Sequence, residues 1–222
     1  MINTKALLSK LLALLTASFV FCTTALAGIV YDNTTSSINN RSFAPPGNNV
    51  EFGDQVFLSG IDRRVTDFTF QYFLSDNASG NETAELFFRL NNGGASGTDP
   101  GTPVYRSGEF GLDRGFQTVT AQGLSVTVPN TFTWSVVFNG IDLGEQAGLL
   151  LYNPPTVGAS FDDFWVKGSD GTTWQTFLVD VGATPANFYA RVVAVPEPST
   201  LALAILGGLA CIGFSRCRRA SQ

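Results

Sequence analysis

The chain has 222 residues, a formal net charge of −5 and no histidine. The missing histidine excludes a Ser-His-Asp triad, a Cys-His dyad and any zinc site built on histidine. The three cysteines, Cys22, Cys211 and Cys217, all lie near the ends of the chain. The body of the protein therefore has neither disulfides nor thiol chemistry.

The first 27 residues have the pattern of a secretory signal peptide. Lys5 and Lys10 precede an apolar run that extends to Phe21, and Ala25 and Ala27 supply small residues at positions −3 and −1. We predict cleavage after Ala27. The alternative, an N-terminal membrane anchor, fits the short apolar run and the Ala-x-Ala site less well.

Residues 28–194 have the length of one domain. They hold 8 basic and 17 acidic residues, which gives the exported part a net charge of −9. Such a surface repels nucleic acid and anionic lipid, so we expect no nucleic-acid partner.

Alternation with a period of two residues dominates this domain. Phe68, Phe70, Tyr72 and Leu74 share one face of segment 65–74, and segments 84–90 and 131–138 alternate in the same way. Each pattern predicts a half-buried strand. No window has a convincing helical stripe. Further strands are predicted at 29–31, 55–58, 104–107, 118–121, 124–128, 148–152, 163–166, 174–179 and 188–193.

Turn-forming residues separate the predicted strands. Segments 75–81 and 91–103 are rich in Gly, Asn and Asp and are predicted loops, and the sequence Asn153-Pro154-Pro155 ends a strand. About a dozen short strands with such turns predict an all-β fold, an antiparallel β-sandwich of jelly-roll-like type. Most of the 19 phenylalanines fall at inward positions and are expected in its core.

The sequence identifies no catalytic residue, metal site or cofactor site. A glycosidase needs only two suitably spaced carboxylates, but no spacing here singles out such a pair. Asp162 and Asp163 could contribute to a calcium site, yet neighbours in a strand point to opposite faces. We therefore expect Asp162 to cap a turn and Asp163 to pair with an arginine.

Two tryptophans are candidates for ligand contact. Trp165 and Trp174 could stack on sugar rings, and the alternative for both is packing in the core or at an interface. Trp165 shares its face with Asp163 and Lys167, which favours exposure and makes it the better candidate. Trp134 has only apolar neighbours on its face and is predicted to lie in the core.

The last 28 residues have a three-part organisation. The sequence Val195-Pro196-Glu197-Pro198-Ser199 is followed by an apolar segment and then by Arg216, Arg218 and Arg219. The prolines hold the first part extended, and residues 199–215 predict a short transmembrane helix. By the positive-inside rule the arginines stay in the cytoplasm and the domain lies on the periplasmic side. The alternative is a proline-rich linker in front of a plain anchor.

Residues 195–219 resemble the PEP-CTERM sorting signal of bacteria, with the motif at 195–199, the helix at 199–215 and the basic tail at 216–219. This region is also called the C-terminal region of ice-binding proteins, a label that implies nothing about ice here. The resemblance implies recognition by exosortase, a membrane cysteine protease, removal of the tail, and delivery to the cell surface or extracellular matrix. The stretch from Ala147 to Trp165 is similar to exported "choice-of-anchor" domains.

Together these patterns indicate a bacterial protein without enzymatic activity that is exported through the general secretion machinery. It would cross the inner membrane and reach the cell surface or extracellular polysaccharide matrix, with exosortase and the membrane as partners. One alternative is a carbohydrate-binding module that contacts polysaccharide through Trp165 or Trp174. Another is a polysaccharide-active enzyme.

Overall fold

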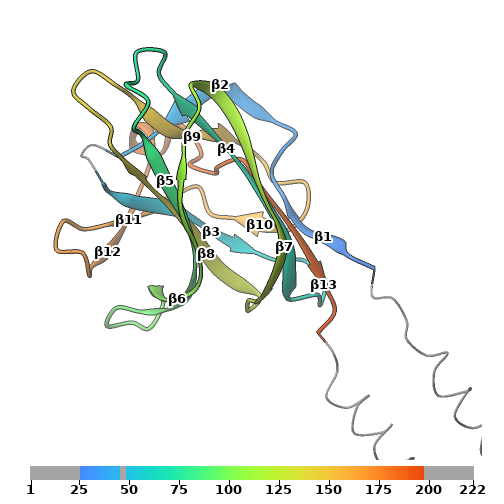
Figure 1. Ribbon diagram of the computed structural model, residues 1–222. Coiled ribbons are helices and arrows are strands. Elements are labelled where there is room, and N and C mark those ends of the chain that lie inside the picture. The colour runs from blue at the N-terminus through green and yellow to red at the C-terminus, as the bar shows by residue number, and fades with distance from the viewer. Residues whose placement is uncertain (1–25, 46–48, 198–222) are drawn as a thin grey trace, which may run out of the picture.

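Two antiparallel β-sheets packed face to face make up the domain (Figure 1). The structure is a computed structural model that describes residues 26–45 and 49–197. It confirms the predicted all-β class. The elements are β1 (Gly28–Asp32), β2 (Ser37–Phe43), β3 (Glu51–Phe57), β4 (Arg64–Leu74), β5 (Thr83–Gly93), β6 (Asp99–Gly111), β7 (Gly115–Thr127), β8 (Thr131–Asn139), β9 (Ala147–Tyr152), β10 (Ala159–Ser160), β11 (Phe164–Lys167), β12 (Trp174–Phe177), the 3-10 turn η1 (Asp180–Gly182) and β13 (Ala190–Val195).

The order of strands in each sheet can be compared with the predicted jelly-roll-like sandwich. In the first sheet β13 lies between β1 and β4, and β7 pairs with the other side of β4; β9 and β2 extend the sheet along β4. In the second sheet the order is β12-β11-β3-β8-β5-β6, with β10 beside β3. The chain passes from one sheet to the other eight times, between β2 and β3, β3 and β4, β4 and β5, β6 and β7, β7 and β8, β8 and β9, β9 and β10, and β12 and β13. Repeated crossing between two packed antiparallel sheets fits the predicted β-sandwich.

The core lies between the sheets and is rich in aromatic side chains. Phe68 and Phe70 alternate along β4 as the sequence predicts, and both are buried. Trp134 on β8 is also buried, and its ring centroid lies 5.2 Å from that of Phe68 and 5.9 Å from that of Phe70. The predicted core position of Trp134 is confirmed. Burial of these large rings is the main contribution to the stability of a domain that has no disulfide.

Several predicted boundaries are wrong for identifiable reasons. The predicted loop at 91–103 is mostly strand, because β5 continues to Gly93 and β6 begins at Asp99. The predicted strands 118–121 and 124–128 are one strand, β7, whose pairing with β4 is interrupted where Gly123 has a φ of 69°. Strand β2 was not predicted, since its sequence is polar and does not alternate.

Among the described residues, no helix is long and apolar enough to cross a membrane. The predicted signal peptide, apart from its last two residues, and the predicted transmembrane helix at 199–215 lie outside the described ranges. So do Ala25, Pro198, Ser199, Arg216, Arg218 and Arg219.

Candidate functional site

The outer face of the second sheet carries a buried network of charged side chains. Glu51 points outward from β3 but is only 5% exposed. Arg89 of β5 donates two hydrogen bonds to its carboxylate, at 2.6 and 2.9 Å. The Ser135 hydroxyl donates a third at 2.6 Å, and the Lys167 ammonium group a fourth at 3.2 Å. Every oxygen of this buried carboxylate therefore has a partner, as a buried charge requires.

A second ion pair extends the network along β5. The guanidinium of Arg106, on β6, binds both carboxylate oxygens of Glu85, which is buried. The ring of Phe87 lies between the two pairs, with the guanidinium carbons of Arg89 and Arg106 at 5.1 and 5.5 Å from its centroid. Cations at such distances from an aromatic ring are attracted to it.

The ring of Trp174 packs over this network of charged side chains. Its ring centroid lies 5.4 Å from the guanidinium carbon of Arg89 and 5.8 Å from the Lys167 nitrogen. Three strands separate β12 from β5 in the sheet, so a flat sheet would place them about 19 Å apart at a spacing of about 4.8 Å per strand. The contact therefore requires the sheet to curl, so that its outer face is concave. Trp174 is 9% exposed and serves here as a packing residue.

Trp165 lies in a different environment, in a surface hollow of about 890 Å³ at one end of the concave face. It is half-buried, and its indole nitrogen donates a hydrogen bond of 3.2 Å to the side-chain oxygen of Gln55. Phe57 and Phe161 also line the hollow, with their rings edge to face at a centroid distance of 4.9 Å. The two tryptophans proposed from the sequence are thus not brought together, and only Trp165 lines the hollow.

Neutral polar groups complete the lining of this hollow. Besides Gln55, the amides are Asn91 and Asn92 at the end of β5 and Asn130 in the turn between β7 and β8. The residues that line it all fall within the described ranges, and none of them carries an ionisable side chain. A few polar groups among aromatic rings are the usual composition of a small-molecule site.

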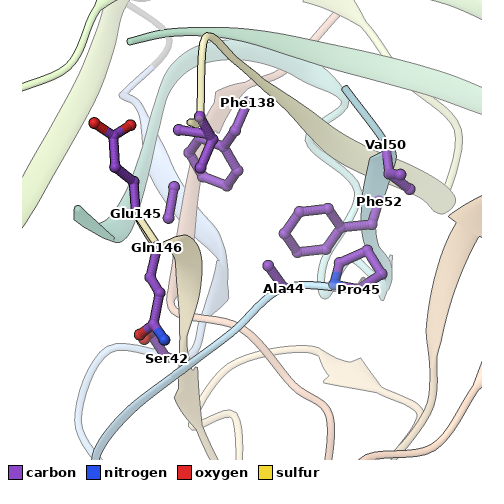
Figure 2. Close-up of a pocket in the computed structure, with 10 residues that line it drawn as sticks. Ser42, Ala44, Pro45, Val50, Phe52, Phe138, Glu145 and Gln146 are labelled. Atoms are coloured by element: carbon purple, nitrogen blue, oxygen red, sulfur yellow. The ribbon is translucent and has the colours of Figure 1, made fainter. Parts of the chain in front are cut away.

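A second pocket, of about 340 Å³, lies at the end of the sandwich near the ends of β2 and β8. Figure 2 shows the rings of Phe52 and Phe138 reaching toward its middle, while the carboxylate of Glu145 points away. That carboxylate accepts a hydrogen bond of 2.9 Å from the backbone nitrogen of Asp142, which closes a local turn. Glu145, the charged residue that lines this pocket, therefore stabilises the neighbouring loop.

The paired aspartates have different surroundings from those predicted. Asp163 has no ion-pair partner within the described part of the chain, so the expected arginine contact is wrong. Burial raises its carboxyl pKa, and the nearby charge of Asp162 adds to the effect. Among the described residues, the side chain of Asp162 does not cap a turn. Its carboxylate accepts a hydrogen bond of 3.4 Å from the side-chain nitrogen of Asn187. In the described residues no group of acidic, histidine or cysteine side chains is suited to hold a metal ion.

Asp54 is a buried acid that sequence reasoning missed. It points into the core opposite Trp134 and is 0% exposed. The hydroxyl of Ser160 donates a hydrogen bond of 2.6 Å to one carboxyl oxygen, and the other oxygen has no partner among the described residues. Burial raises the pKa of Asp54 well above its usual range, and the hydrogen bond from Ser160 opposes this only in part.

Both ends of the domain leave it at the same place. Strands β1 and β13 are antiparallel neighbours, and Gly28 pairs with Ala194 (Figure 1). Ala27, the last residue of the predicted signal peptide, is exposed just before β1. Pro196 and Glu197 are exposed just after β13, which ends at Val195. The predicted cleavage site and the start of the tail motif are therefore side by side.

The comparisons with known proteins agree with this description of the tail. The family model of the PEP-CTERM protein-sorting motif matches residues 194–219. No curated protein and no solved structure matches the chain. The protein is thus an all-β domain that carries a PEP-CTERM sorting motif, and the match begins at the end of its last strand. That motif implies recognition by exosortase and export toward the cell surface.

Proposed function

We propose that this chain is a non-catalytic surface or matrix protein that exosortase releases from its tail after export. The observation that carries the proposal is the PEP-CTERM match at residues 194–219, which begins within β13. The signal peptide would direct the chain across the inner membrane and be removed after Ala27. The domain would stand on the periplasmic side until the tail is cut and would then reach the cell surface or extracellular matrix.

The geometry of the chain ends supports this order of events. Because Gly28 pairs with Ala194, both membrane-directed segments leave the same end of the sandwich. They can therefore lie in one bilayer without any distortion of the domain. Cleavage beyond Pro196 removes no residue that pairs in a sheet, since β13 ends at Val195. The processed domain would keep its complete core.

The chemistry of the acidic side chains supports a non-catalytic role. Glycoside cleavage needs two carboxyl groups that flank a bound sugar. Glu51 and Glu85 are held in ion pairs with arginine, and Asp54 is closed off in the core. Trp165 lies in a hollow whose lining is neutral. These three acids are thus separate from the lining of the Trp165 hollow.

The test is a double substitution, Pro196→Ala with Pro198→Ala, in the native bacterium. We expect the variant to accumulate with its tail in the inner-membrane fraction, because the extended segment that exosortase recognises is lost. Fractionation followed by immunoblotting of the domain measures the outcome. Pro103→Ala, an exposed proline on β6, is the matched control and should be released normally.

The double substitution lies beyond the last strand, so the domain should melt at the same temperature as the parent. Release of the double variant at the parental rate would contradict recognition of the motif. It would favour a simple linker in front of a membrane anchor.

A further inference from the structure

The amide groups around the Trp165 hollow share one pattern. Their oxygens accept hydrogen bonds from the protein itself: Gln55 from the Trp165 indole at 3.2 Å, and Asn130 from the Arg63 guanidinium at 2.7 Å. Indole and guanidinium groups only donate, which fixes the oxygen of each amide on the protein side. The oxygen of Asn91 likewise accepts from the hydroxyl of Thr133 at 2.8 Å.

The side-chain nitrogens of the same three amides are not used in hydrogen bonds within the described part of the protein. Within the described residues, the side-chain nitrogens of Gln55, Asn91 and Asn130 donate no hydrogen bond, and that of Asn91 is buried without a partner. The hollow therefore presents N–H donors from β3 and from the turn before β8, whereas the Asn91 nitrogen is shielded from solvent and is not among them.

Aromatic rings supply the second half of the pattern. Trp165 stands on β11, and Phe57 and Phe161 pack edge to face beside it. The hydrogen bond to Gln55 holds the indole in place. A sugar ring has a face of C–H groups that packs on an aromatic ring and a rim of hydroxyl oxygens that accept from amide N–H groups.

The charges nearby favour a neutral ligand over an acidic one. The lining has no cation, and the neighbouring Arg89 and Lys167 are already bonded to Glu51. Residues 28–194 carry a net charge of −9, which repels an acidic polymer. An apolar ligand without hydrogen-bond acceptors would fill the hollow but leave the amide donors unpaired, at a cost in affinity.

We propose that the hollow around Trp165 is a binding site for a neutral glycan. Trp165 provides the stacking surface, and Gln55 and Asn130 donate hydrogen bonds to sugar oxygens. This rests on the proposed export and goes beyond it, because it gives the exported domain a ligand, a neutral polysaccharide outside the cell.

The experiment is a binding assay with the full-length chain in a detergent that contains no sugar. The probes are immobilised neutral polysaccharides (a β-glucan, a galactomannan and a dextran) and alginate as the anionic comparison. We expect retention on at least one neutral polymer and none on alginate. Trp165→Ala should weaken that retention at least about tenfold, which corresponds to about 1.4 kcal/mol.

Two further variants keep the test informative if Trp165→Ala misfolds. Trp165→Phe keeps an aromatic ring and should bind within a few-fold of the parent. Asn130→Asp replaces a free donor by an acceptor at almost unchanged size, keeps an oxygen for Arg63, and should lose binding. Phe116→Ala removes an exposed ring on β7, in the other sheet, and should have no effect.

Three results would overturn the proposal. They are failure of every neutral polysaccharide to retain the parent chain, retention that survives Trp165→Ala in a folded variant, and preferential binding of alginate. None of these results depends on whether the tail is processed, so this test is independent of the sorting experiment.

Discussion

The outer faces of the two sheets both carry polar side chains at alternating positions, but those of the first sheet interact in contact with solvent and those of the second sheet are largely buried. On the first sheet, between β4 and β7, the hydroxyl oxygens of Thr69 and Thr120 lie 3.1 Å apart and Gln71 donates to Thr118 at 3.0 Å, and both hydrogen bonds are exposed to solvent. On the second sheet, charged residues at the equivalent outward positions are buried. The difference arises because the second sheet curls until Trp174 reaches Arg89.

This comparison shows that alternation along a strand does not determine whether its polar face is exposed to solvent or buried. Where the sheet stays open, outward side chains interact weakly in water. Where it curls, the same kind of face becomes a second interior, in which every charge needs a partner. The hollow around Trp165 lies where this second interior ends and opens to solvent.

The largest effect is expected from Arg89→Ala. The change leaves Glu51 buried with only Ser135 and Lys167 as partners, and loss of one member of a buried pair costs about 3–5 kcal/mol. Urea unfolding of the purified protein measures the free energy of unfolding. A loss below about 1 kcal/mol would mean that this face is open to water and that the sheet is flatter than described.

Gly53→Ala tests how closely the strands approach beneath Trp165. A Cβ atom at position 53 would lie 1.9 Å from the carbonyl oxygen of Trp134 and 2.5 Å from the Cα atom of Ser135. We expect destabilisation of about 1–3 kcal/mol, as for other forced overpacking. Gly111→Ala on β6 is the matched control, since its Cβ would meet nothing within 4 Å. Equal effects of the two changes would contradict the close approach.

Asp54→Asn tests the buried acid in the core. The folded protein holds this carboxyl protonated at pH values where the unfolded chain, with its ordinary pKa of 3.8, has lost the proton. The contribution of Asp54 to the stability of the parent should therefore be complete below the unfolded-state pKa and be lost as the pH rises through the folded-state pKa.

The Asp54→Asn variant keeps the side chain neutral, so it should melt higher than the parent near neutral pH. The shift should be about 2–4 °C for each kcal/mol gained, and the advantage should vanish in acid. Thermal melts at a series of pH values measure it. A variant that is less stable than the parent at every pH would show that Asp54 is charged and paired in the folded state.

The smallest effect is expected on the first sheet. Gln71→Ala removes an exposed hydrogen bond to Thr118 and should change the free energy of unfolding by less than about 0.5 kcal/mol. The same urea titration applies. A cost close to that of Arg89→Ala would erase the contrast between the two outer faces.

The sequence predicts well those elements whose pattern is local. Strand β4 follows from its alternating Phe68, Phe70 and Tyr72, and the core position of Trp134 follows from its apolar neighbours. Strand β2 was missed because its pairing with β9 does not depend on alternation and its backbone turns at Asn39 and Asn40, which have positive φ. Gly93 and Gly101 suggested a loop, but each allows two strands to approach closely.

The candidate site could be predicted only in part. Trp165 was singled out because it shares a face with charged neighbours, and the structure places it in the hollow. Its partners come from β3, β5 and the β7–β8 turn, more than 30 positions away along the chain. The curl of the sheet, which brings them together and buries Trp174, is a property of packing that alternation does not record. The mixture of Glu85, Phe87 and Arg89 on one face of β5 was the available signal.

The central claim is that sorting sequences direct this domain out of the cell and that exosortase then removes the tail. The most direct test is intact mass spectrometry of the native protein from the cell surface or medium. We expect a chain that begins at Gly28 and ends near Pro198. A mature chain that retains Arg219 and remains in the membrane fraction would contradict the claim and identify a plain membrane anchor.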